Sequence, residues 1–269
     1  MRSPAPPAAA ASPPEPVRQR YPIVLEAHDI VKELGQGAGK VMALKGVNLT
    51  LEAGELTLMM GPSGSGKTTL LSILGCILAP TSGRVVIGGR DMQGLGPEQL
   101  AEVRRNNIGF IFQSYNLFPT LTALENVRLA LDVRGASRSD GIIKAETALR
   151  QVGLGNRLNS YPRNMSGGEQ QRVAVARALA GAPSVILADE PTAALDSENG
   201  HAVMALLAQI AQQDKTRAVL AVTHDPRTHS YADRIIRIED GLIVGEERRE
   251  EARKNVARYD LTRKRKANA

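Results

Sequence analysis

The sequence predicts an α/β fold built on a mostly parallel core sheet. Three short runs, residues 56–60, 185–188 and 218–222, are apolar apart from Thr57. Runs of this length are too short for buried helices and are typical of strands that a parallel sheet buries on both faces. Longer helix-like segments lie between them, and strand alternating with helix indicates a right-handed, doubly wound sheet.

Residues 23–51 have a different pattern, in which short alternating segments flank the glycine-rich stretch 35–40. Period-two alternation interrupted by glycine is typical of antiparallel strands joined by a turn. The spacing within this stretch, and Val41 where a hydroxyl residue is required, argue against a phosphate-binding role. We therefore expect an N-terminal antiparallel β-subdomain ahead of the core.

Helical periodicity accounts for most of the remaining chain. Residues from about 114 to 180 are mostly helical and lie between two core strands, which predicts an inserted helical subdomain. The individual helices are expected at 67–78, 97–105, 121–131, 140–152, 168–180 and 198–214.

The two ends of the chain differ from its body, residues 21–245. Residues 1–20 are rich in Pro and Ala and lack the apolar core of a secretory signal. We expect a disordered leader there, with an organelle transit peptide as the alternative. Residues 246–269 are alternately acidic and basic, which indicates a solvated basic tail; contact with anionic lipid is the alternative.

Charge and cysteine content narrow the function classes. The net charge of +6 comes from the ends, because residues 1–20 contribute +2 and residues 246–269 carry nine basic against five acidic side chains. A neutral body argues against a nucleic-acid partner. Cys76 is the only cysteine, which excludes an intrachain disulfide and indicates a reducing compartment. The apolar stretches fall far short of the ~20 residues that a spanning helix needs, so no membrane crossing is expected.

A complete phosphate-binding loop lies between the apolar run 56–60 and the helix-like segment that follows it. Glycines in such a loop let consecutive backbone N–H groups point at one anion, and the N-terminus of the next helix favours negative charge. Lys67 is placed to reach the terminal phosphates of a nucleoside triphosphate, and the Thr68 hydroxyl to hold its Mg²⁺. The nucleotide-binding residues are expected to be Gly61, Pro62, Ser63, Gly64, Ser65, Gly66, Lys67, Thr68 and Thr69.

Two adjacent carboxylates, Asp189 and Glu190, end the apolar run 185–188. Neighbouring residues of a strand point to opposite sides, so the two acids are free to take different roles. Asp189 suits the Mg²⁺ shell of the nucleotide. Glu190 suits the base that polarises the water attacking the γ-phosphate.

Residues 164–172, with the sequence Asn-Met-Ser-Gly-Gly-Glu-Gln-Gln-Arg, run directly into a helical segment. Ser166, Gly167 and Gly168 at a helix start offer a hydroxyl and unhindered N–H groups to a phosphate. This string resembles the signature motif of ATP-binding cassette (ABC) ATPases. The resemblance implies the P-loop NTPase ABC ATPase fold and a head-to-tail homodimer, in which the signature of one subunit closes over the ATP held by the other.

Further positions match motifs of that family in the family's order. Gln113, in a strand-like segment, matches the glutamine that contacts Mg²⁺ and the attacking water. Asp196 matches the loop that reaches across the dimer, and His224 matches the switch histidine that contacts the γ-phosphate. The resemblance thus implies Glu190, His224 and Gln113 as catalytic residues, Thr68, Gln113 and Asp189 as metal ligands, and Ser166, Gly167, Gly168 and Asp196 as further nucleotide-binding residues.

The chain also departs from the family pattern. Met165 stands where leucine is commoner, Glu169 where glutamine is commoner, and Ala194 where serine is common. Leu34 occupies the place of an aromatic ring that usually stacks on adenine. We therefore expect adenine to be held by apolar contact without ring stacking.

Within the family, residues 188–196 and the insertion at 35–40 are similar to the branch of macrolide exporters, lipoprotein-releasing transporters and the heterocyst glycolipid exporter. This resemblance implies an ATP-hydrolysing subunit, peripheral to the cytoplasmic face of the inner membrane. It would power export through a separate FtsX-like or MacB-like membrane permease, often with a membrane-fusion adaptor. The alternative is a non-transport ABC ATPase that regulates a cell-division or envelope-remodelling membrane partner.

Overall fold

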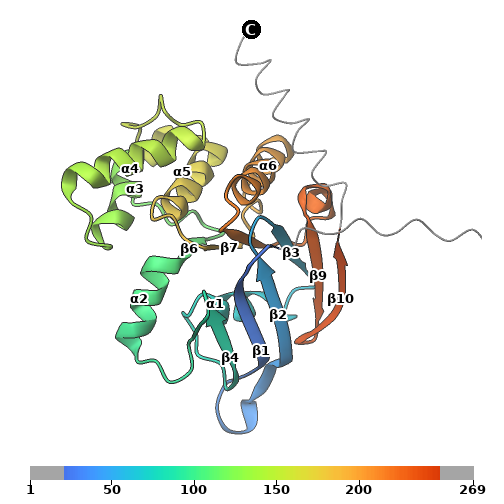
Figure 1. Ribbon diagram of the computed structural model, residues 1–269. Helices are drawn as coiled ribbons and strands as arrows, with labels where there is room; N and C mark the ends of the chain where they lie inside the picture. The colour runs from blue at the N-terminus through green and yellow to red at the C-terminus, as the bar shows by residue number, and fades with distance from the viewer. Residues whose placement is uncertain (1–20, 249–269) are drawn as a thin grey trace, which may run out of the picture.

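The computed structural model describes residues 21–248, which fold around two β-sheets (Figure 1). The expected leader, residues 1–20, and residues 249–269 of the expected tail lie outside the described residues. Among residues 21–248, no helix combines the length and the apolar character that crossing a bilayer requires.

The N-terminal sheet is antiparallel, as predicted, with the strand order β2-β1-β4-β5. The glycine-rich stretch forms a turn with a short 3-10 helix, η1 (Gly37–Gly39), so that Leu34 pairs with Val41 across the hairpin. The strands are β1 (Ile23–Leu34), β2 (Val41–Glu52), β4 (Ser82–Ile87) and β5 (Arg90–Asp91).

The core sheet has the strand order β10-β9-β3-β8-β7-β6. Its centre consists of the three strands predicted from apolar runs, β3 (Leu56–Met60), β8 (Ala218–Val222) and β7 (Val185–Asp189). The strands from β9 to β6 run parallel, whereas β10 pairs antiparallel with β9. The outer strands are β6 (Ile108–Ile111), β9 (Arg234–Glu239) and β10 (Leu242–Arg248).

The last strand continues past residue 245, where the body of the chain was expected to end. Arg248 pairs with Arg234 in the β9–β10 ladder, and its guanidinium donates to Glu55 Oε1 at 2.7 Å and to Glu52 Oε1 at 2.5 Å. These contacts offset the entropy lost when charged side chains are ordered. Residues 246–248 are therefore part of the sheet and not of a solvated tail.

The α-helices lie close to the positions that periodicity predicts. One differs: helix α1 ends at Leu74 and not at residue 78, because Gly75 caps it and Cys76 takes a left-handed backbone with φ 54°. The helices are α1 (Lys67–Leu74), α2 (Pro97–Asn107), α3 (Ala123–Asp132), α4 (Arg138–Gln151), α5 (Gly167–Leu179) and α6 (Ser197–Gln213), with short 3-10 helices η2 (Pro162–Asn164) and η3 (Pro226–Tyr231).

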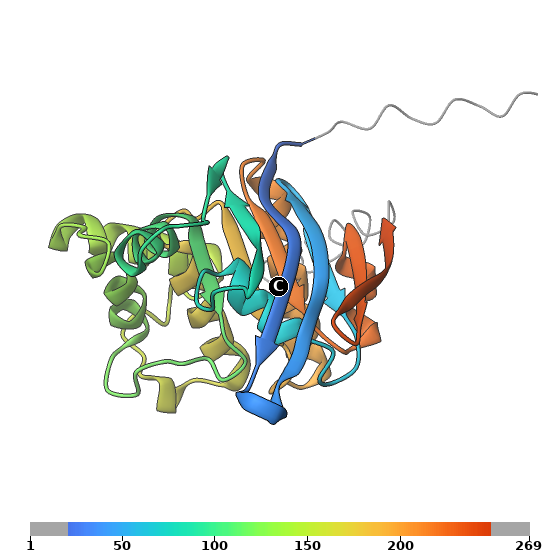
Figure 2. The same ribbon diagram turned by 90° about the horizontal axis from the view of Figure 1, so that it is seen from below.

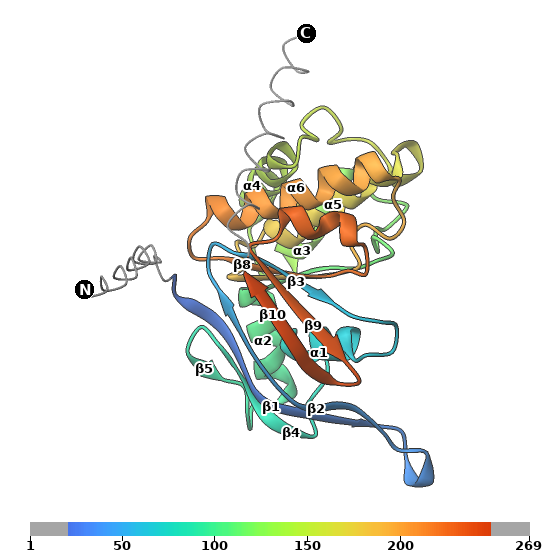
Figure 3. The same ribbon diagram turned by 90° about the vertical axis from the view of Figure 1, so that its right-hand side faces the viewer.

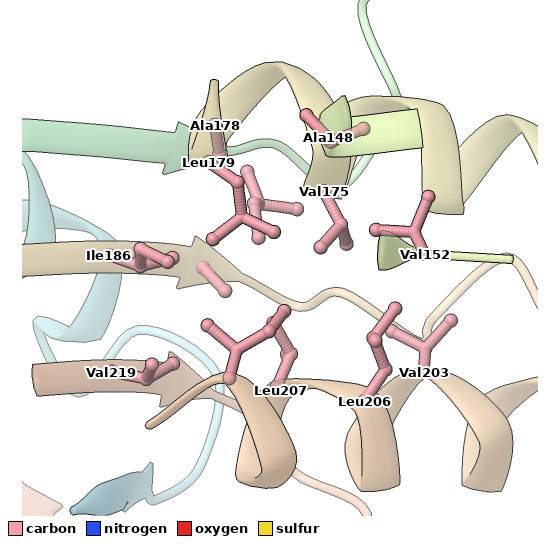
Figure 4. Packing of buried hydrophobic residues seen from close by; sticks show 14 of the residues in the cluster. Ala148, Val152, Val175, Ala178, Leu179, Ile186, Val203, Leu206, Leu207 and Val219 are labelled. Carbon is pink, nitrogen blue, oxygen red and sulfur yellow. The ribbon is translucent and has the colours of Figure 1, made fainter. Parts of the chain in front are cut away.

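Different elements cover the two faces of the core sheet. Along β7, Ile186 and Ala188 pack with residues of α5 and α6, whereas Val185 and Leu187 pack with α1 and the antiparallel sheet. Figure 4 shows the first layer, in which side chains of α5 and α6 meet Ile186. In Figure 3, α3 to α6 lie above the core sheet and the antiparallel sheet lies below it. Helices α1 and α5 are therefore on opposite faces.

The long strand pair β1–β2 crosses the middle of the molecule when it is seen from below (Figure 2). The green and yellow helices lie on one side of this pair, and the orange-red strands β9 and β10 lie on the other. The blue hairpin tip that contains η1 projects beyond the remaining elements (Figure 3).

Candidate functional site

The phosphate loop joins the end of β3 to the start of α1. Gly64 and Gly66 take left-handed backbones, with φ of 80° and 99°. Gly66 also begins the helix, because its carbonyl accepts from Leu70 N at 2.8 Å. A side chain at either glycine would strain this path. A curled loop that leads into a helix is the arrangement that binds phosphate through backbone N–H groups.

The loop is tightly held between two strands. A Cβ on Gly61 would lie 2.0 Å from the Ile238 carbonyl oxygen of β9, and a Cβ on Gly66 would lie 2.6 Å from the Ala43 carbonyl oxygen of β2. Ser65 is 2% exposed, and its hydroxyl has no hydrogen-bond partner within residues 21–248. A buried hydroxyl without a partner is costly. A phosphate oxygen is therefore a fitting acceptor at this position.

Lys67 is folded back onto the loop that precedes it. Its Nζ donates to the Gly61 carbonyl at 2.8 Å and to the Pro62 carbonyl at 2.6 Å, and the residue is 7% exposed. Burial lowers the pKa of Lys67, and the carboxylates of Glu190 and Asp189 oppose that shift. Neutral carbonyls satisfy an ammonium less well than anionic oxygens do. The side chain is thus placed to exchange these carbonyls for phosphate oxygens.

Thr68 and Asp189 come together as expected for a metal site. Thr68 Oγ1 donates to Asp189 Oδ1 at 3.3 Å, across a sequence separation of 121 residues. Burial raises the pKa of Asp189, and the Thr68 hydrogen bond opposes this shift. A hydroxyl and a carboxylate at this separation are oxygen donors of the kind that Mg²⁺ prefers. The residues present therefore fit the implied Mg²⁺.

Glu190 faces His224 across the ends of neighbouring strands. Glu190 Oε1 lies 3.2 Å from His224 Nδ1, and the His224 side chain is 68% exposed. Glu190 takes a left-handed backbone with φ 44°, and its N–H donates to the Val222 carbonyl at 3.0 Å. Such a backbone is rare for a residue with a side chain and is often retained where it orients a functional group.

Gln113 lies at the same edge of the core sheet. Strand β6 ends at Ile111, which pairs with Ala188, the residue just before Asp189. The exposed Gln113 follows two residues later. The structure thus places the phosphate loop, the two carboxylates, Gln113 and His224 at the carboxyl ends of the parallel strands, where ligands of open α/β sheets bind.

The signature residues form the capped start of α5. Ser166 Oγ accepts from Glu169 N at 3.2 Å, and Glu169 Oε2 accepts from Ser166 N at 2.9 Å. This reciprocal pair is a capping box. Arg157 Nε donates to Glu169 Oε1 at 2.9 Å. Hydrogen bonds from Ser166 and Arg157 lower the pKa of Glu169, with the backbone bond from Ser166 the largest cause. The Glu169 that departs from the family pattern therefore has two anchoring partners.

The signature also contacts the loop that contains Asp196. A Cβ on Gly168 would lie 2.2 Å from Asn199 Oδ1, so the starts of α5 and α6 interlock. Asp196 Oδ1 accepts from Asn199 N at 2.9 Å, and Asp196 Oδ2 accepts from Asn199 Nδ2 at 2.7 Å. These bonds, led by the backbone bond, lower the pKa of Asp196. Within one chain, Asp196 is therefore the N-cap of α6.

The two halves of the predicted site are not on the same face of the sheet. Helix α1, which follows the phosphate loop, packs in one layer, and α5, which follows the signature, packs in the other. The groups at the phosphate-loop edge include Lys67, Thr68, Asp189 and Glu190. Ser166 instead contacts its own helix through Glu169.

Three further residues connect these halves, and motif matching missed them. Arg177 of α5 donates to the Tyr115 carbonyl at 2.8 Å and to the Asn116 carbonyl. Tyr115 and Asn116 both take left-handed backbones, with φ of 55° and 49°. A Cβ on Gly167 would lie 3.0 Å from the Tyr115 hydroxyl. The loop after Gln113 is thus held against the signature helix by contacts that no local sequence signal marks.

The expected adenine contact, Leu34, lies at the tip of the β1–β2 hairpin and is 41% exposed. Its cross-strand partner Val41 is 64% exposed, and the adjacent Met42 is 47% exposed. The next residue, Ala43, touches the phosphate loop through its carbonyl. Leu34 and Val41 therefore form an exposed cross-strand apolar pair on the hairpin whose Ala43 carbonyl meets the phosphate loop.

Comparison with known proteins agrees with this geometry. Residues 44–193 match the sequence model of the family described as "ABC transporter". The chain is 47% identical over 226 residues to an "Uncharacterized ABC transporter ATP-binding protein" of Thermotoga maritima, covering 84% of this chain and 96% of the relative. It is 45% identical over 233 residues to the "Macrolide export ATP-binding/permease protein MacB" of a Shewanella strain, covering 87% of this chain and 36% of the relative. The chain thus spans about a third of the length of that macrolide export relative.

A solved structure has the same fold. It is described as the dimeric structure of a post-hydrolysis state of the ATP-binding cassette MJ0796 bound to ADP and Pi, with a TM-score of 0.75 and 43% sequence identity. The match covers 83% of this chain and 98% of that structure. The chain therefore belongs to the ABC transporter family, as an ATP-hydrolysing cassette.

Proposed function

We propose that this cassette hydrolyses ATP at sites built from two copies of the chain and thereby drives a membrane permease. The observation that carries this proposal is the separation described above, with the phosphate loop leading into α1 on one face of the core sheet and the signature leading into α5 on the other. In a head-to-tail dimer, the signature of one copy can face the phosphate loop of the other copy.

Within one site, Lys67 exchanges the Gly61 and Pro62 carbonyls for phosphate oxygens of ATP, and the loop N–H groups surround the same phosphates. Thr68, Asp189 and Gln113 are the residues that would hold Mg²⁺. The ion, when bound, supplies charge neutralisation on the phosphates.

Glu190 accepts a proton from the attacking water, and His224 stands beside it to contact the γ-phosphate. The 3.2 Å contact between them supports this pairing, because it holds the base and the phosphate-sensing residue in one arrangement. Ser166, Gly167 and Gly168 of the second copy present a hydroxyl and N–H groups to the same γ-phosphate, and Asp196 lies beside them.

The permease is of the FtsX-like or MacB-like type, with a membrane-fusion adaptor as a further partner. The macrolide export relative supports this assignment, because its name combines an ATP-binding and a permease function. The cassette then lies at the cytoplasmic face of the inner membrane, and closure of the dimer on ATP is transmitted through α3 to α5. The transport direction proposed is export.

A mixing experiment tests the composite site. Lys67→Ala inactivates the phosphate loop, and Ser166→Asn alters the signature while preserving an N-cap, because Asn caps helices as well as Ser does. Each variant alone is expected to lose ATP turnover. A mixture forms hetero-dimers in which one site has both groups intact, so turnover should return. Absence of recovery in a mixture shown to contain hetero-dimers contradicts the composite site.

A further inference from the structure

Arg227, which lies in η3 shortly after His224, joins two loops of the site. Its guanidinium donates from Nε to Asp225 Oδ1 at 2.9 Å and from Nη2 to Asp225 Oδ2 at 2.8 Å. The remaining arm, Nη1, donates to Ser197 Oγ at 2.6 Å. Ser197 is the first residue of α6 and directly follows Asp196. One planar side chain therefore holds the histidine loop and the start of α6 in a single arrangement.

The surroundings are built to keep this arrangement. The Asp225 carbonyl accepts from Thr228 Oγ1 at 2.7 Å, and Asp225 Oδ1 also accepts from Arg227 N at 2.9 Å. Arg227, Ser197 and Asp196 line one small pocket together with His201 of α6. The His224 loop and the Asp196 loop thus border the same small hollow.

The ion pair between Arg227 and Asp225 is expected to contribute little to the stability of the fold. The Arg227 side chain is 58% exposed, and exposed ion pairs typically contribute 0–1 kcal/mol. A bidentate arginine–carboxylate pair nevertheless fixes geometry strongly, because the fork allows one orientation. The contact is therefore better suited to positioning than to stabilisation.

We propose that Arg227 is a positioning residue that couples the His224 loop to the Asp196 loop, and so couples the two nucleotide sites of the dimer. This inference rests on the proposed function, because only a composite site gives Asp196 a role at the second nucleotide. The contacts form a continuous series within one chain, from Glu190 to His224, through Asp225 and Arg227 to Ser197. From Asp196 the series continues through Asn199 to Gly168 of the signature.

A double-mutant cycle on the full chain tests the coupling. Arg227→Ala and Ser197→Ala each remove one side of the same bond, and we expect each to lower kcat for ATP about fivefold with KM changed less than about twofold. The double variant should be no slower than either single variant, because the link is already broken. Arg227→Lys should not restore kcat, since one ammonium cannot grip both carboxylate oxygens and reach Ser197.

Arg150→Ala is the matched control, because it removes an arginine that is 61% exposed and paired with Glu146 on the surface of α4, away from the phosphate loop and the His224 loop. It should leave kcat and Tm unchanged. If Arg227→Ala lowers Tm more than this control does, its kcat is confounded by lost stability. The kcat of Ser197→Ala then decides whether the coupling exists, because alanine is well tolerated in a helix.

Three results overturn the coupling: wild-type kcat in either single variant, losses that multiply in the double variant, or full restoration by lysine. Failure of the proposed function is recognised separately, by the lack of recovery when Lys67→Ala and Ser166→Asn are mixed. Recovery in that mixture together with wild-type kcat in Arg227→Ala rejects the coupling while leaving the composite site intact.

Discussion

Gly168 and Asn199 interlock at the point where the starts of α5 and α6 meet. The Asn199 amide occupies the space that a side chain at Gly168 would need, since a Cβ there would lie 2.2 Å from Asn199 Oδ1. The same amide donates to Asp196 Oδ2 at 2.7 Å. The absence of one methyl group at Gly168 thus allows the signature helix and the Asp196 loop to be set relative to each other.

Gly168→Ala should therefore destabilise the protein by about 1–3 kcal/mol, as expected for forcing an extra methyl group into a packed contact. Relief requires Asn199 to move and to lose its bond to Asp196. Adding Asn199→Ala to Gly168→Ala should recover most of the loss, because it removes the clash and the backbone N–H at position 199 can still donate to Asp196. Chemical denaturation of wild type, Gly168→Ala and the double variant measures this. A double variant that is less stable than Gly168→Ala alone would show that the interlock does not set the cost.

Glu190→Gln should bind ATP with nearly unchanged affinity and lower kcat by about 10²–10⁴-fold, because glutamine keeps the shape and loses the proton acceptor. Lys67→Ala should instead weaken ATP binding itself, since the buried ammonium is removed from the loop. Fluorescent-nucleotide titration and phosphate release separate the two effects. Wild-type turnover in Glu190→Gln would exclude Glu190 as the base.

The contribution of Glu169 to the free energy of unfolding should decrease at acid pH. The folded pKa of Glu169 is lowered by hydrogen bonds from Ser166 and Arg157, so its stabilising contribution is present above the unfolded value of about 4.5. This contribution is lost as the pH falls through the lower folded value. Glu169→Gln retains the capping box and removes the charge, so it should cost about 0.5–1 kcal/mol at pH 7.

Urea unfolding of both forms between pH 3 and pH 7 tests this expectation. The difference between wild type and Glu169→Gln should shrink toward zero at the acid end. An equal difference at every pH would show that the ionised carboxylate is not responsible. Glu146→Gln on α4 is a suitable comparison, because Glu146 also pairs with an arginine, Arg150, but lies outside a capping box.

Leu34→Tyr should strengthen ATP binding about 2–10-fold, because an aromatic ring adds stacking of about 0.5–1.5 kcal/mol to apolar contact. Leu34 is 41% exposed at the hairpin tip beside Val41, so a ring fits without core rearrangement. Ile143→Tyr places a ring on the exposed surface of α4 and should leave affinity unchanged. Calorimetric titration with ATP and GTP checks both. Equal affinities in wild type and Leu34→Tyr would place adenine elsewhere.

Local sequence patterns were sufficient to predict the strands that are buried on both faces and the phosphate loop. Strands at 56–60 and 218–222 coincide with the predicted runs, because a strand buried on both faces is predominantly apolar, with Thr57 the one polar residue in these two strands. The phosphate loop was equally predictable, since left-handed backbones at Gly64 and Gly66 demand glycine. Strands β4, β5 and β10 did not emerge as strands, because their many exposed positions give them the composition of loops. Strand β9 is largely buried but did not emerge either, because Arg234, Arg237 and Glu239 interrupt its apolar residues.

Relations between distant segments were decided by tertiary packing. The family resemblance assigned the phosphate loop with Lys67 and the signature with Ser166 to different subunits of a dimer. That α1 and α5 pack in different layers of one chain follows only from the alternation of side chains along β7 in the folded sheet. The contacts of Gly168 with Asn199 and of Arg227 with Ser197 have no periodic or local signal. They depend on which strand ends are neighbours in the sheet, and strand order is a property of the folded chain and not of any single segment.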